Sequence, residues 1–158
     1  MILLAKIDLL DKFVLNYGGQ IIAPQKVIEE ACGKEREETP SITQLVKDKR
    51  TSVFKVQNPK LTRKLMEDFS IGQGESEALV VALQEKASLV ATDDRNAMRA
   101  CKMLKMKFTT AIAVVIRAFE KNLIKKDEAL TKLLKLESVG RYSQKIIEDA
   151  RKQIEGRV

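Results

Sequence analysis

The chain has 158 residues, with 29 Lys plus Arg against 22 Asp plus Glu, a formal net charge of +7 and a sequence pI near 9.4. It contains no histidine, which excludes Ser-His-Asp and Cys-His catalysis and zinc sites built on histidine. The remaining chemistry is that of carboxylates, lysine, tyrosine, thiols or a bound metal, and the positive charge favours a polyanionic partner, with nucleic acid first.

Composition predicts a helix-rich globular protein with one core, because 44% of the residues are hydrophobic and 32% are charged. Cys32 and Cys101 stand alone in the sequence, so we expect two reduced thiols. The apolar opening of the chain is too short to cross a bilayer. We therefore expect a cytoplasmic protein that does not bind membranes.

Helical spacing of apolar residues and short β-branched runs predict the elements in chain order. Thr110 is expected to cap one helix, and a charged loop is expected at 33–39. Predicted helices cover about 2–17, 24–32, 41–49, 58–69, 75–86, 94–104, 111–121, 126–136 and 143–155, and predicted strands cover 20–23, 51–56, 88–92 and 107–109.

The most informative stretch runs from Ile71 to Arg95. A helix that begins near Glu75 places this residue on the same stripe as Leu79 and turns Glu77 to the opposite side. A carboxylate held against an apolar core is costly unless it is compensated, and a divalent cation is one such compensation. The alternative is that both acids favour the positive end of their helix.

A second acidic pair, Asp93 and Asp94, follows the predicted strand 88–92. Ligands of open α/β sheets bind beyond the carboxyl ends of the strands, so this position favours a site. The simpler alternative is that Asp94 only caps the next helix. In the helix 24–32, Glu30 flanks the buried stripe and is the better candidate for a third site carboxylate.

Oxygen ligands without histidine or thiolate suit Mg²⁺ or Mn²⁺, which can lower the pKa of a bound water and stabilise charge on a phosphoryl group. A nuclease would use an acidic metal site inside a basic exterior in this way. A nucleotide cradle at Gly72-Gln73-Gly74 is disfavoured, because the third glycine is missing and the acids that follow would repel a pyrophosphate.

A basic stripe follows the Asp pair. Arg95, Arg99 and Lys102 recur along one side of the predicted helix 94–104. Such a stripe is commonly a solvated face. Because its charges share one sign and it begins beside the acids, contact with RNA phosphates is an equal alternative.

These residues resemble the PIN-domain ribonucleases, and among them the small prokaryotic proteins related to toxins of toxin–antitoxin pairs. The motifs are ILLAKIDLL at 2–10, Pro24-x-x-Val27-x-x-Glu30, Gly72-x-Gly74-Glu75-x-Glu77-Ala78, Thr92-Asp93-Asp94-Arg95, and Thr110 with Arg117-Ala118. The resemblance implies a three-layer α/β/α fold with a parallel sheet flanked by helices. It also implies an acidic site for Mg²⁺ or Mn²⁺ that cleaves RNA.

By motif, Glu30, Glu75 and Asp93 match the catalytic, metal-binding acids of the family, and Asp94 and Glu77 are further metal-binding candidates. We expect one PIN-like domain over 1–158, of which about 122–158 is a C-terminal helical extension. A cognate antitoxin protein and a homodimer are the expected protein partners.

The sequence departs from the family at its start. The family begins with a strand that is central in its sheet and ends in an aspartate or asparagine, which is a principal metal ligand, whereas this sequence begins at the helix that follows. Either a strand is encoded upstream of Met1, or the protein is a shortened member with impaired catalysis. The alternatives to a metal-dependent endoribonuclease are therefore a module that binds RNA or a protein partner without cleavage, and a structural dimer formed by the last two helices.

Overall fold

The computed structural model describes residues 1–33, 39–140 and 142–156, which divide into two compact units. The predicted loop 33–39 lies almost entirely outside the described residues. The first unit joins Met1–Gly18 to Thr110–Val158, and the second is Gly19–Thr109. The described helices include none with the length and hydrophobicity that a bilayer-spanning segment needs.

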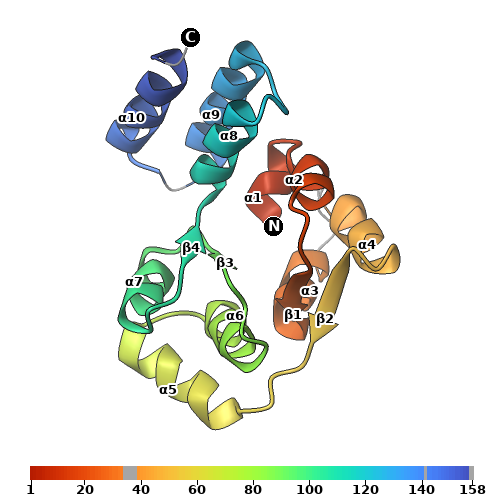
Figure 1. Ribbon diagram of the computed structural model, residues 1–158. Helices are drawn as coiled ribbons and strands as arrows, with labels where there is room; N and C mark the ends of the chain where they lie inside the picture. The colour runs from red at the N-terminus through yellow and green to blue at the C-terminus, as the bar shows by residue number, and fades with distance from the viewer. Residues whose placement is uncertain (34–38, 141, 157–158) are drawn as a thin grey trace. The chain divides into compact units, whose positions relative to one another are not determined.

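The described part of the first unit is helical (Figure 1). In this unit α9 packs against α1, α8 and α10. Leu133 and Leu136 of α9 are fully buried, whereas Leu134 is half exposed. The helices are α1 (Ile2–Lys6), α2 (Leu10–Asn16), α8 (Ala111–Glu120), α9 (Lys126–Val139) and α10 (Gln144–Glu155).

The prediction of one continuous helix over 2–17 was wrong. This segment is interrupted at Asp8, which adopts a left-handed backbone with φ of 55°. Lys132 of α9 donates hydrogen bonds from Nζ to the carbonyl oxygens of Ile7 and Asp8, at 2.8 and 3.3 Å. A lysine distant in the sequence thus binds the carbonyls that a continuous helix would have used internally.

The second unit alternates short strands with helices. Its elements are β1 (Ile21–Pro24), α3 (Gln25–Cys32), α4 (Thr39–Lys47), β2 (Thr51–Phe54), α5 (Pro59–Phe69), α6 (Gln73–Gln84), β3 (Val90–Ala91), α7 (Arg95–Met103) and β4 (Phe108–Thr109). The helix α4 begins before Ser41, which therefore lies within its first turn and does not cap it.

The described strands form two parallel pairs. In the first, Ile21 pairs with Thr51 and Pro24 with Phe54; in the second, Val90 pairs with Phe108. This confirms the predicted α/β class with parallel strands and extra C-terminal helices. Within the described residues no strand joins β1 to β3, and the acid that the resemblance places on a central strand has no counterpart there.

Helix α6 is the centre of this unit, since it packs against β1 and β3 and against α3, α5 and α7 (Figure 1). Surrounded in this way, it buries residues on several sides. The hydroxyl of Ser76, which is fully buried, donates to the carbonyl oxygen of Thr62 in α5 at 2.7 Å. The expected contrast between Glu75 and Glu77 is therefore absent, and both are half-buried.

Candidate functional site

Glu30 lies against the start of α6. A Cβ atom added to Gly74, the second residue of α6, would lie 2.6 Å from Oε2 of Glu30. The carboxylate of α3 therefore occupies space that any other residue at position 74 would fill. The side chain of Glu30 is half exposed and forms an ion pair with Lys26, with 3.9 Å between Nζ and Oε1.

Glu75 also lies against the start of α6. A Cβ atom added to Gly72 would lie 2.6 Å from Oε2 of Glu75, so this side chain folds back over the N-terminus of its own helix. The positive end of a helix favours a carboxylate there. The two glycines thus leave room for two carboxylates, one from each helix. The sequence placed Gly72 and Gly74 in the family motif and disfavoured them as a phosphate cradle, but it did not predict that they leave room for the carboxylates of Glu30 and Glu75.

Asp93 and Asp94 have different surroundings. Asp94 caps α7, because its Oδ1 accepts a hydrogen bond from the backbone N–H of Ala97 at 2.7 Å. Its own N–H donates to the hydroxyl of Thr92 at 3.2 Å. Capping is the simpler of the two alternatives for Asp94. The cap uses one of the two carboxylate oxygens of this residue. Asp93 is half-buried between the end of β3 and the start of α7.

The fifth candidate acid, Glu77, is held within its own helix. Gln73 donates from Nε2 to Oε1 of Glu77 at 2.8 Å. Its side chain lines a cavity between α3, α5 and α6. The structure therefore gives Glu77 an environment different from that of Glu75, although both are half-buried.

A metal centre needs several ligands at one point. The donor type of the candidate acids suits Mg²⁺ or Mn²⁺. However, no three acidic or thiol side chains among residues 1–33, 39–140 and 142–156 are grouped closely enough to hold an ion. The structure brings Glu30 and Glu75 to one turn but does not add Asp93 as a third ligand. The described geometry alone therefore does not fit a three-carboxylate metal site.

The three basic candidates lie on α7 and are exposed. Arg99 donates from Nη2 to the carbonyl oxygen of Phe69 at 3.4 Å, close to the C-terminus of α5. This contact satisfies a helix-terminal carbonyl and gives Arg99 a structural role. Arg95 opens the helix and Lys102 lies in its last turn, and contact of any of the three with RNA stays a prediction.

Short parallel strands surrounded by helices define an α/β protein, in which Asp93 and Asp94 follow the end of β3. The model of a family described as PIN domain matches residues 1–156, so the chain belongs to the PIN-domain family. This membership implies nuclease-type activity in general, commonly dependent on a divalent metal. No curated protein and no solved structure matched the chain.

Proposed function

We propose that this protein is a metal-dependent endoribonuclease that hydrolyses RNA phosphodiester bonds, with Glu30, Glu75 and Asp93 as the metal-binding acids. The observation that carries the proposal is the contact of Glu30 with Gly74 beside Glu75. Carboxylate oxygens of two acids from separate helices lie beside Gly72 and Gly74 at the start of α6, and the family of the chain is one of nucleases. Mg²⁺ or Mn²⁺ would supply an activated water and stabilise the charge of the cleaved phosphate.

The substrate follows from charge and family together. A net charge of +7 favours a polyanion, and PIN membership suggests RNA. Arg95, Arg99 and Lys102 are the proposed phosphate contacts on α7. Because the described acids do not form a group of three, the proposal requires Asp93 to approach the Glu30–Glu75 turn when an ion binds.

The test is cleavage of RNA with Mg²⁺ or Mn²⁺ by the wild-type protein and by the Asp93→Asn variant. Loss of about 2.7 kcal/mol of transition-state stabilisation would lower the rate roughly 100-fold. Asp68→Asn is a matched control, since Asp68 is an exposed acid of α5 whose partner is Lys64. Equal rates for the wild type and Asp93→Asn would reject the assignment of the site.

A second candidate function is a module that binds RNA or a protein partner without cutting. It is favoured by the absence of a three-acid group among the described residues and by the separation of their strands into two pairs. Titration with Mn²⁺ separates the two functions. Tight binding that is lost in Asp93→Asn supports the enzyme, whereas RNA binding that is indifferent to metal supports the module.

The biological role, the location and the protein partners are also part of the proposal. By resemblance, the protein would be the toxin of a toxin–antitoxin pair and would act in the cytoplasm against RNA. It would have a cognate antitoxin as its partner and residues 122–158 as an extension of a single PIN-like domain. Leu134, half exposed on α9, is the place at which we propose contact between two copies. Sedimentation of Leu134→Glu beside the wild type tests the dimer.

A further inference from the structure

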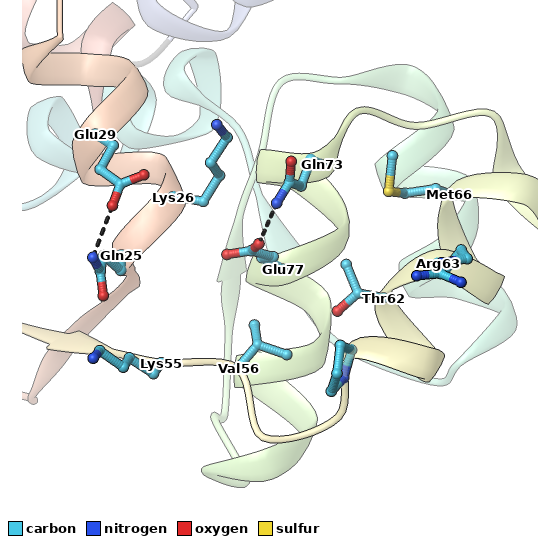
Figure 2. A pocket seen from close by; sticks show the side chains of 11 residues that line it. Gln25, Lys26, Glu29, Lys55, Val56, Thr62, Arg63, Met66, Gln73 and Glu77 are labelled. Carbon is cyan, nitrogen blue, oxygen red and sulfur yellow. Dashed lines mark hydrogen bonds between the residues drawn. The ribbon is translucent and has the colours of Figure 1, made fainter.

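A cavity of about 630 Å³ lies beyond the carboxyl ends of β1 and β2 (Figure 2). Gln25 directly follows β1, Lys55 directly follows β2, and both line it. Ligands of open parallel sheets bind at this edge. Its volume is within the range of sites for small molecules and single nucleotides. The cavity is therefore placed and sized as a binding site.

Its lining combines an apolar part with three cations and two carboxylates, which are Lys26, Lys55, Arg63, Glu29 and Glu77. Val56, Pro59 and Met66 provide apolar surface. Lys55 and Arg63 also line the cavity, and in the part of the chain that the structure describes neither has a carboxylate within ion-pair distance. The cations of the lining exceed its carboxylates by one, and an apolar surface beside a net positive charge suits a base with its phosphate.

Two glutamine–glutamate pairs add hydrogen-bonding groups. Gln25 donates to Glu29 at 2.8 Å along α3, and Gln73 donates to Glu77 at 2.8 Å along α6; Figure 2 shows both bonds. Each pair keeps a second amide hydrogen and further acceptor lone pairs, so the lining can both donate to and accept from a base edge. Bases of single-stranded RNA are recognised by such contacts when they are unstacked.

The cavity also adjoins the Glu30–Glu75 turn. Lys26 lines the cavity and pairs with Glu30, and Gln73 lines it from the position between Gly72 and Gly74. A strand of RNA whose base entered the cavity would therefore have its neighbouring phosphate close to the proposed site.

We propose that this cavity binds one nucleotide of single-stranded RNA. The base lies on the apolar lining, and Lys55 and Arg63, which lie on different sides of Val56 in Figure 2, hold the two phosphates that flank it. The inference rests on the proposed function, because it identifies where the RNA substrate is bound. It needs no metal, and this allows it to be tested separately from cleavage.

The experiment measures fluorescence anisotropy of a labelled single-stranded ten-nucleotide RNA in EDTA at several salt concentrations. The double variant Lys55→Gln with Arg63→Gln is expected to bind roughly tenfold more weakly. Its slope of log K against log salt should fall by about 1.4, since each lost phosphate contact accounts for about 0.7 in single strands. The matched control is Lys60→Gln with Lys64→Gln, which removes the same charge from α5 outside the cavity. This control should stay within about twofold of the wild type.

A second variant tests the base rather than the charge. Met66→Gln makes the apolar part polar without changing the net charge, so affinity for the RNA should fall roughly tenfold. Affinity for an oligonucleotide that lacks a base at every position should not change. Circular dichroism of each variant establishes that it is folded.

The outcomes are separable. If the wild type binds no RNA with or without metal, both the proposed function and this inference are overturned. If the wild type binds RNA but the Lys55 and Arg63 variant keeps its affinity and salt slope, only the inference is overturned. The inference is also overturned if these variants no longer bind an acidic peptide but still bind RNA, because the cavity would then be a protein-docking site.

Discussion

Lys132 is a buried cation whose removal should be costly. It is 7% exposed, donates to the carbonyl oxygens of Ile7 and Asp8, and lies 3.5 Å from Oε1 of Glu128. Ile7 is fully buried, and Asp8 holds the left-handed backbone that separates α1 from α2. The ammonium group therefore satisfies polar atoms that have few alternative partners.

The substitution Lys132→Met keeps the length of the side chain and removes its donors. A hydrogen bond to a charged group contributes about 1.5–3 kcal/mol, and a buried carbonyl left without a donor costs about 1–3 kcal/mol. Methionine recovers part of this loss, because a buried ammonium no longer has to be desolvated. We expect a net decrease of about 2 kcal/mol in the free energy of unfolding.

Lys135→Met is the matched control, since Lys135 is on the same helix and contacts the same residue. Its Nζ lies 3.0 Å from Oδ2 of Asp8, but the two side chains are 49% and 77% exposed. Such a pair contributes at most about 0.5 kcal/mol after solvent screening. Urea unfolding followed by circular dichroism should therefore separate the two variants by about 1.5 kcal/mol. If Lys132→Met unfolds within about 0.5 kcal/mol of Lys135→Met, the buried lysine is not what stabilises the break at Asp8.

Three further predictions concern single contacts. Gly74→Ala should displace the carboxylate of Glu30 from α6. The free energy of unfolding should change by less than about 1 kcal/mol, because alanine favours the helix. A greater loss in urea unfolding would mean that the side chain of Glu30 cannot move. The hydrogen bond from Lys12 lowers the pKa of Glu128. This ion pair therefore adds about 0.5 kcal/mol to the free energy of unfolding above pH 4.5, and the contribution is lost as the pH falls through the lowered pKa. Glu128→Gln should then be less stable than the wild type at pH 7 and equal to it near pH 2, and a constant difference would contradict this. Asn58→Ala removes the cap of α5 and should cost about 1 kcal/mol in thermal unfolding, whereas no cost would show that the cap is replaced by water.

The sequence by itself determined the features that depend on neighbouring residues. The predicted cap at Thr110 and the cap that was one of two alternatives for Asp94 are both present, because in each a side chain accepts a hydrogen bond from a backbone N–H three residues later. The strands were predicted within about two residues at each end, and Cys101 is buried as a free thiol whose pKa is raised by burial. Family membership was also readable, because its motifs are short and local.

Only the tertiary structure decided where distant residues meet. The break at Asp8 depends on Lys132, and the position of Glu30 depends on the absence of a side chain at Gly74. Neither contact leaves a periodic trace in the sequence, since each joins residues from separate helices. The same holds for the pairing of the strands and for the cavity beside Lys55 and Arg63. Hydrogen bonds within a helical turn are set by chain connectivity, whereas contacts between elements are set by packing, which depends on the whole unit at once.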